Sequence, residues 1–347
     1  MNQEIAADGK LNNEVRTAKA FRSKKEEKRY WMLLIALLLI GVIAAYGLLV
    51  YNNPVPVDSP SFLPVARRRM YAVVAMIIAA IAHSISTVTF QSITNNRIIT
   101  PSLLGFEALH STIHTSLLFF FGAQALINFT GTGAFLFQIG IMVLMCLLLF
   151  GWLLTKEQGN LQLMLLIGVI IGTGLRSLSS FMRRMISPSE FDILQSRLFG
   201  SVNNAQTEYF PIAIPIVIIA AVLLILYANK LNVLSLGKNT ATTLGVKHQP
   251  AIIYPLVLVS ILMSVSTALI GPLTFYGFLI ATLTYQAAPT YDHRYLFPMA
   301  FAIGFAIITL AYFLMNHVFS GAGVVSVIIE LFGGLIFLFV ILRKGVL

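Results

Sequence analysis

The stretch NKLNVLSLGKNTATTLGVKHQ, residues 229–249, decides how the fold of this chain is read. It carries three lysines and no acidic residue, and it separates two long apolar runs at 211–228 and 251–268. The segment between Gly237 and Gly245 is long enough for about two turns of helix. The pattern predicts a short basic helix between two membrane spans, a suitable shape for a docking element on the cytoplasmic face. An ordinary hydrated loop is the alternative that the residues alone leave open.

The composition around this stretch is that of a membrane protein. Of the 347 residues, 58% are hydrophobic and 10% are charged, and the mean hydropathy is +0.86. These values exclude a soluble globular protein. We predict an all-α polytopic membrane protein of about ten transmembrane helices with a short cytoplasmic helix, because about ten apolar stretches approach the ~20 residues that cross a bilayer. The expected spans are 30–50, 71–92, 103–126, 133–155, 161–182, 209–229, 251–268, 270–286, 296–316 and 324–342.

The basic residues predict the orientation of these spans. Residues 1–29 carry eight lysines and arginines ahead of the first span, which places the N-terminus in the cytoplasm. We read this segment as a retained basic tail and not as a cleaved signal peptide. Ten spans then place the C-terminus in the cytoplasm as well. Arg67, Arg68 and Arg69 fall on the outer side against the rule, so they need a separate explanation.

Several classes of active site are disfavoured. The residues from Gly237 to Thr240 resemble part of a phosphate loop, but Asn239 stands where Ser or Thr must follow the lysine. Any ATP-driven role therefore requires a separate ATPase. The single cysteine, Cys146, excludes an internal disulfide and a cysteine-based metal site. We expect no catalytic residues, no cofactor, no bound metal and no nucleic-acid partner.

Polar residues inside the expected spans are candidate functional groups. Arg176 favours an aqueous path that accepts an anion, because a guanidinium in a membrane is costly unless it is paired or hydrated. Snorkelling to the outer interface is the alternative. His110 and His114 stand at i,i+4, with Glu107 one turn earlier, which is compatible with a metal or proton site. There is no third ligand in view, so polar packing between helices is the favoured interpretation.

Three blocks of the sequence carry a family resemblance. They are FQSITNNRIITPSLLG (90–105), LNVLSLGKNTATTLGV (231–246) and GPLTFYGFLIATLTYQ (271–286), the last followed by DHRYLFP (292–298). In this order and spacing they resemble the membrane-spanning permease subunits of the iron-siderophore and cobalamin ATP-binding-cassette importers, the FecCD-like family.

The resemblance implies a set of partners and a domain organisation. Residues 30–347 would form one ten-span permease domain in the inner (cytoplasmic) membrane, in contact with its lipids. Two permeases would surround the translocation path, with two cytoplasmic ATPase subunits and an extracytoplasmic siderophore-binding protein. Within the coupling segment 230–247, the expected ATPase-docking residues are Leu234, Leu236, Gly237, Lys238, Thr240, Ala241, Leu244 and Gly245.

The resemblance also bears on the outer arginines and on the path. An arginine by which the family docks its binding protein falls on Arg69, and a second falls on Ala72, a departure that leaves Arg67 and Arg68 as the expected substitutes. Exposed arginines suit bidentate pairing with carboxylates. The expected pathway residues are Gln91, Arg176, Arg183 and Arg184.

A variant form of the third block, together with SLSSFMRRMISPSEFDILQSRLF (177–199), resembles the subgroup that handles catecholate ferric siderophores. Members of that subgroup often pair with a second, different permease. We therefore predict a permease subunit for a ferric siderophore, driven by separate ATPases. The rival hypotheses are an ion-coupled secondary transporter of a small anionic solute, with Glu107 and His110 as coupling groups, and a purely structural membrane scaffold.

Overall fold

The structure is a computed structural model, and it describes residues 20–51, 59–60, 62–156, 161–202, 205–319 and 324–344. All regular secondary structure in these ranges is helical. The elements are α1 (Lys24–Val50), α2 (Phe62–Thr94), η1 (Pro101–Leu104), α3 (Phe106–Asn128), α4 (Gly131–Lys156), α5 (Leu161–Arg184), α6 (Pro188–Leu198), η3 (Thr207–Tyr209), α7 (Phe210–Leu226), α8 (Ala228–Leu234), α9 (Lys238–Thr243), α10 (His248–Ile270), α11 (Tyr276–Ala287), α12 (His293–His317) and α13 (Val325–Lys344).

The helices agree with the predicted all-α polytopic membrane protein. Each of the ten expected spans coincides with one element: α1 to α5, α7 and α10 to α13. By length and composition, seven described helices are long and apolar enough to cross a membrane. Of the other three, α3 is kinked at Gly122, α11 has 12 residues, and α13 has 20 residues, of which the described part from Val325 to Phe339 forms a shorter apolar helix.

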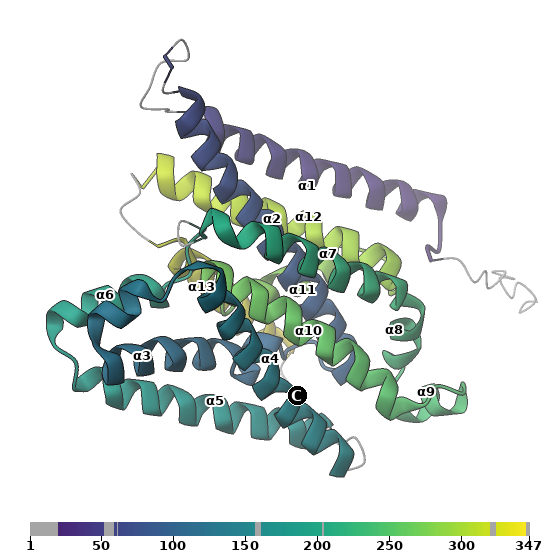
Figure 1. Cartoon of the computed structure of the whole chain (residues 1–347). Helices are drawn as coiled ribbons and strands as arrows, with labels where there is room; N and C mark the ends of the chain where they lie inside the picture. The colour runs from purple at the N-terminus through teal and green to yellow at the C-terminus, as the bar shows by residue number, and fades with distance from the viewer. Residues whose placement is uncertain are drawn as a thin grey trace, which may run out of the picture.

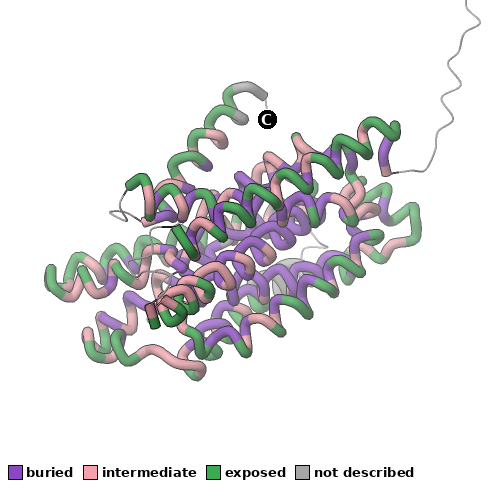
Figure 2. The backbone as a smooth tube through the Cα atoms, turned by 90° about the horizontal axis from the view of Figure 1, so that it is seen from above, coloured by how far each residue is buried: buried purple, intermediate pink, exposed green. Residues whose placement is uncertain are grey.

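Helix α2 lies at the centre of the bundle and packs against α7, α10, α11 and α12. It is buried almost continuously from Ala75 to Ile93, and alanines, serines and threonines make up much of this stretch. Figure 2 shows the buried interior in purple. Small side chains let neighbouring helices approach closely, as where Gly277 of α11 lies against Thr87.

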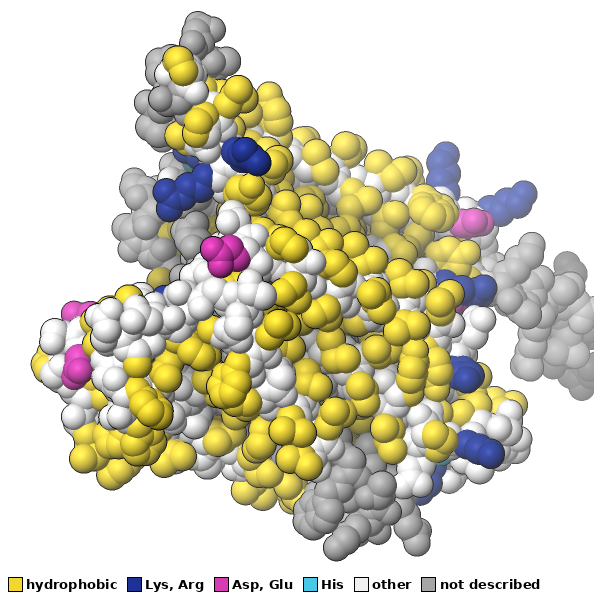
Figure 3. All heavy atoms as spheres, in the orientation of Figure 1, with side chains coloured by type: hydrophobic (Ala, Val, Ile, Leu, Met, Phe, Trp, Pro, Cys, Tyr) yellow, Lys and Arg dark blue, Asp and Glu magenta, His cyan; other side chains and the backbone are white. Residues whose placement is uncertain are grey.

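The two ends of the bundle differ in elements and in charge. Figure 1 shows α8, α9 and the start of α1 at one end, and α6, the end of α1 and the start of α2 at the other. In the same orientation, Figure 3 shows Lys and Arg gathered at the α8–α9 end, a smaller basic group at the opposite end, and an apolar surface between them. This distribution agrees with a cytoplasmic position for the α8–α9 end.

The first helix extends beyond the expected span at its N-terminal end. Residues 1–19 of the predicted tail lie outside the described residues, but α1 begins at Lys24. The Ser23 side chain accepts a hydrogen bond from the Glu26 backbone N–H, which stabilises a helix start there. Just before it, Phe21 is buried against the rings of Tyr30 and Tyr295.

Helix α2 also begins earlier than expected, at Phe62 and not near residue 71. Arg67, Arg68 and Arg69 therefore lie within the second turn of this helix or just after it, and not before its start. Pro64 is compatible with this, because a proline is tolerated in the first turn of a helix.

The expected spans 251–268 and 270–286 form a helical hairpin, α10 and α11. Helix α10 ends at Ile270, and Gly271 has a φ of +85°, a conformation that favours glycine. A side chain at this position would also meet the backbone of Phe199 and Gly200. The turn and the segment after α6 can therefore pack together only because both glycines lack a side chain.

Candidate functional site

The coupling segment forms a short helix held between two glycines, as predicted. Helix α9 starts after Gly237, whose φ is +93°. At its end, the Gly245 N–H bonds to the Thr242 carbonyl and the Val246 N–H bonds to the Ala241 carbonyl, each at 3.0 Å. These two bonds, with Gly245 at a φ of +82°, form a Schellman motif. The sequence terminates this helix sharply at both ends.

The apolar residues of the segment face in two directions. Ala241 and Leu234 are buried, so they hold the segment against the bundle. Leu236 and Leu244 are 57% and 59% exposed. Although Ala241 and Leu244 are three positions apart, they do not form a common apolar edge, because Leu244 is the C-terminal cap of α9 and is exposed. The exposed face also carries Lys238, Thr240 and Gly245.

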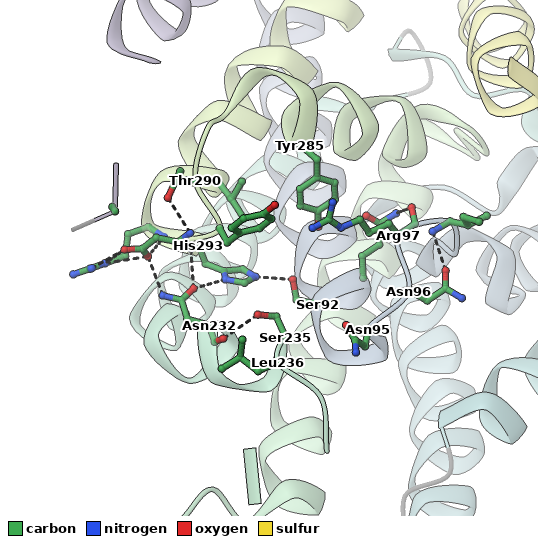
Figure 4. Close-up of a pocket in the computed structure, with 17 residues that line it drawn as sticks. Ser92, Asn95, Asn96, Arg97, Asn232, Ser235, Leu236, Tyr285, Thr290 and His293 are labelled. Carbon is green, nitrogen blue, oxygen red and sulfur yellow. Dashed lines mark hydrogen bonds and ion pairs between the residues drawn. The ribbon is translucent and has the colours of Figure 1, made fainter. Parts of the chain in front are cut away.

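A cavity of ≈ 1110 Å³ opens beside α9 (Figure 4). Four parts of the chain form its walls: the segment just before α1, the end of α2 with the turn that follows, α8 with the next two residues, and the junction of α11 and α12. The lining residues are Ala20, Gln91, Ser92, Asn95, Asn96, Arg97, Ile98, Asn232, Ser235, Leu236, Tyr285, Thr290, Tyr291, Asp292, His293, Arg294 and Leu296.

A hydrogen-bond network in the cavity wall joins α8, α12 and α2. The Asn232 side chain donates to Asp292 Oδ1 at 3.0 Å, and its Oδ1 accepts from the His293 backbone N–H at 2.9 Å and from His293 Nδ1 at 2.5 Å. Because an amide oxygen only accepts, Nδ1 carries a proton. His293 Nε2 lies 2.6 Å from Ser92 Oγ on α2. A buried imidazole thus connects the helix before the coupling segment to the central helix.

Asp292 has a second role at the start of α12. Its carboxylate accepts from the Arg294 backbone N–H at 3.0 Å, as an N-cap, and from the Arg294 guanidinium at 2.6 Å. Partial burial alone would raise the pKa of the Asp292 carboxyl. The hydrogen bonds from Arg294 and Asn232 outweigh burial and lower this pKa below its usual value.

Gln91 and Arg97 shape the turn after α2. The Gln91 side chain is buried and donates to the Arg97 carbonyl at 2.7 Å. The Arg97 guanidinium lies 4.6 Å from the ring centre of Tyr285 and 5.6 Å from that of Tyr291. Gln91, expected to line the path, therefore holds a turn at the wall of this cavity.

The three outer arginines differ in their surroundings. Arg67 and Arg68 are exposed, whereas Arg69 is half-buried. Arg69 Nη1 donates to the carbonyls of Leu48 and Tyr51, both at 3.2 Å, at the C-terminal end of α1. A guanidinium there satisfies carbonyls that have no partner within the helix.

The other expected pathway residues lie on α5. Arg176 and Arg184 are exposed and Arg183 is half-buried, with Arg183 and Arg184 in the last turn of the helix. The basis for expecting a buried guanidinium at Arg176 is therefore wrong for the single chain, because its side chain projects from the surface of α5. The pathway role itself stays a prediction.

His110 and His114 pack between helices. Gln138 of α4 lies 2.6 Å from His110 Nδ1, and His114 Nδ1 lies 3.0 Å from the His110 carbonyl. A search of the described residues finds no group of three or more His, Cys, Asp or Glu side chains arranged to hold a metal ion. The contacts support the favoured interpretation of interhelical polar packing.

Comparison with known proteins identifies the family. The model of the FecCD transport family matches residues 31–343. The chain belongs to the FecCD transport family. It is a multi-pass membrane permease of a bacterial ATP-binding-cassette importer, and the predictions of a permease subunit and of a non-enzyme are confirmed.

Two relatives within this family match over most of their length. The chain is 69% identical over 345 residues to the petrobactin import system permease protein FatC of Bacillus anthracis, covering 99% of this chain and 98% of that protein. It is 34% identical to the petrobactin import system permease protein YclO of Bacillus subtilis, and the match covers 90% of this chain and 95% of that protein.

A solved structure shares the fold. It is described as an inward-facing conformation of a metal-chelate type ABC transporter, and it matches with a TM-score of 0.73 at 22% identity. The match covers 91% of this chain and 100% of that one. At this identity the likeness supports the fold alone.

The residues of the network carry no sequence signal that marks them individually as a site. Asn232, Asp292 and His293 all lie in the blocks that carry the family resemblance, so the signal for them belongs to the blocks as a whole. Their mutual contacts could not be inferred, because Asn232 and His293 are 61 positions apart.

Proposed function

We propose that this chain is the permease subunit for a ferric siderophore of the catecholate type, with petrobactin as the first candidate. The observation that supports this most strongly is 69% identity, over nearly the full length of both chains, to a petrobactin import permease. The ferric chelate is the cargo in this proposal, and separate ATPases supply the energy.

A second, different permease completes the path in this proposal. Bacillus anthracis has another protein named as a petrobactin import permease, FatD, to which this chain is 24% identical over 91% of its length. Two distinct permeases named for one import system favour a heterodimer over a homodimer. Two cytoplasmic ATPase subunits and an extracytoplasmic binding protein complete the proposed importer.

The geometry around α9 supports its role as the ATPase-docking element. Leu236 and Leu244 flank the helix and are exposed, whereas Ala241 anchors it. Exposed apolar side chains beside a basic helix favour contact with another protein. Movement of α9 would pass through α8 to Asn232 and from there to α12 and α2, which are central in the bundle.

Orientation and domain organisation complete the proposal. We place residues 1–29 and the C-terminus in the cytoplasm and residues 30–347 in the cytoplasmic membrane. Arg67 and Arg68 are the proposed contacts for acidic groups of the binding protein, since both are exposed. Arg176, Arg183 and Arg184 are the proposed cationic groups of the outer path, with Gln91 in a positioning role.

Co-purification tests the docking proposal. We expect Leu236→Asp and Leu244→Asp to abolish capture of the ATPase by the purified permease pair, because a charge replaces an exposed apolar contact. Leu63→Asp is a matched control, since Leu63 is 74% exposed at the opposite end of the bundle. Equal capture by all three variants would contradict the docking role of α9.

Transport assays test the function. ATP-dependent uptake of ferric petrobactin into proteoliposomes that hold the full importer is expected, and Arg176→Ala is expected to reduce it. Uptake that persists without the ATPase, but is lost in Glu107→Gln, would favour the ion-coupled transporter instead.

A further inference from the structure

Two carboxylates inside the bundle share one hydroxyl group. Glu107 lies in the first turn of α3, Thr274 in the turn between α10 and α11, and Glu330 on α13. Thr274 Oγ1 is 2.6 Å from Glu107 Oε2 and 3.3 Å from Glu330 Oε1. The turn lies one α11 length, ~18 Å, from the end of α11 that borders the cavity. The cluster is therefore deep within the membrane-spanning part.

These side chains cannot satisfy one another. A hydroxyl has one hydrogen to donate and an ionised carboxylate only accepts, so Thr274 serves one carboxylate at a time. Glu107 is only 8% exposed, and its Oε1 has no hydrogen-bond partner among the described residues. Neither carboxylate forms an ion pair with a described residue. The cluster therefore has fewer hydrogen-bond donors than its carboxylate oxygens can accept, and among the described residues no cation forms a direct ion pair with it.

Ser102 is a second, independent sign of an incomplete site. It lies in η1, directly before α3, and it is 1% exposed. Its hydroxyl lies beside the Glu107 carboxyl and has no hydrogen bond to any other described group. Buried polar groups are normally paired, so a hydroxyl and a carboxylate oxygen that have only each other as neighbours can bond a further polar group.

Access and charge select the kind of ligand. Glu330 is half-buried whereas Glu107 is buried, so the cluster is reached from the α13 side. Arg176, on α5, is near enough to act electrostatically on Glu107. An ammonium group has several N–H donors and one positive charge, which is what two carboxylates with one shared hydroxyl lack. A resident metal ion is disfavoured, because the described residues contain no cluster of three acidic or histidine ligands.

We propose that Glu107, Glu330 and Thr274 form a subsite for a protonated amine of the transported chelate, while Arg176 faces its anionic part. This inference rests on the proposed function and makes it more specific. The subsite would select chelates that carry both a negatively charged metal centre and a cationic amine. Arg176 would attract the negative charge and the two carboxylates would attract the amine.

A pair of probes that differ in one charge tests the subsite. The first is a ferric bis-catecholate with a secondary amine in its linker, and the second is the same chelate with that amine acetylated. Uptake is measured in proteoliposomes containing the full importer, with wild-type permease, Glu107→Gln and Glu330→Gln. Glu208→Gln is the matched control, since Glu208 is exposed and outside the cluster.

We expect either cluster variant to reduce uptake of the amine probe by about tenfold or more, because a charge-assisted hydrogen bond is lost. Uptake of the acetylated probe should change less than about twofold. Equal loss of both probes, or no loss of either, would overturn the subsite while leaving the proposed function intact. Failure of the wild type to import either probe with ATP would instead overturn the proposed function. If Glu107→Gln does not assemble with the ATPase, uptake of the two probes is compared in Glu330→Gln alone, because Glu330 is half-buried and its substitution disturbs the packing less.

Discussion

Replacing Asn232 with alanine should uncouple α8 from α12. The change removes the acceptor of two donors on His293, the backbone N–H and Nδ1–H, and His293 is 1% exposed. A buried donor left without a partner costs about 1–3 kcal/mol. We therefore expect the loss of both hydrogen bonds to destabilise the fold by about 2–4 kcal/mol, because water from the adjacent cavity can replace part of what is lost.

The single cysteine provides the assay. Cys146 is buried, so a fluorescent maleimide reacts with it only when the permease unfolds. The apparent unfolding temperature at one fixed scan rate is compared between variants, because membrane-protein unfolding is commonly irreversible. We expect Asn232→Ala to lower this temperature clearly, and Asn239→Ala, on the exposed face of α9, to leave it unchanged.

A second variant separates the two sides of Asn232. Asn232→Asp keeps an oxygen that accepts from His293. It replaces the Asn232 side-chain N–H donor, which lies 3.0 Å from Asp292 Oδ1, by a second negatively charged carboxylate oxygen. It should also be destabilised at neutral pH. In the full importer, Asn232→Ala should retain ATPase binding and lose uptake per ATP consumed. If Asn232→Ala matched Asn239→Ala in both assays, the reasoning from the network would be refuted.

Three further outcomes are expected. Gly245→Ala should weaken ATPase capture in a binding assay, because a φ of +82° costs an alanine about 1–2 kcal/mol. Arg67→Glu and Arg68→Glu should reduce capture of the binding protein in pull-downs, whereas Arg69→Gln should lower the unfolding temperature, since Arg69 bonds the end of α1. The lowered pKa of Asp292 means that its contacts stabilise the fold above the ordinary carboxyl pKa of about 3.9 and lose this effect as the pH falls through the lowered value. Asp292→Asn should therefore lower the unfolding temperature at pH 7 and flatten its dependence on acid.

The spans and the coupling helix were predictable because their causes are local. A run of about 20 apolar residues has few alternatives to a membrane helix. Two glycines around residues 238–244 likewise predict a helix with sharp ends, and the Schellman motif at Gly245 agrees. The helix starts were predicted less well. Ser23 and the first turn of α2 extend the helices beyond their apolar runs, which hydropathy does not detect.

Which side chains face the bundle and which face outward could not be predicted from the sequence. Ala241 and Leu244 share an i,i+3 spacing, yet one is buried and the other is exposed, because α9 ends between them. Arg67 and Arg69 are equally basic and two positions apart, but only Arg69 is half-buried against the end of α1. Packing against other helices decides such differences.

By itself, the sequence determined the fold class, the positions and order of the apolar helices, the basic coupling segment and the family. Bilayer thickness, hydropathy and short motifs act within single segments, so they can be read without a structure. Only the tertiary structure decided which polar residues meet. Asn232 reaches His293 across 61 positions and Glu107 reaches Thr274 across 167, and such contacts depend on how separate helices pack.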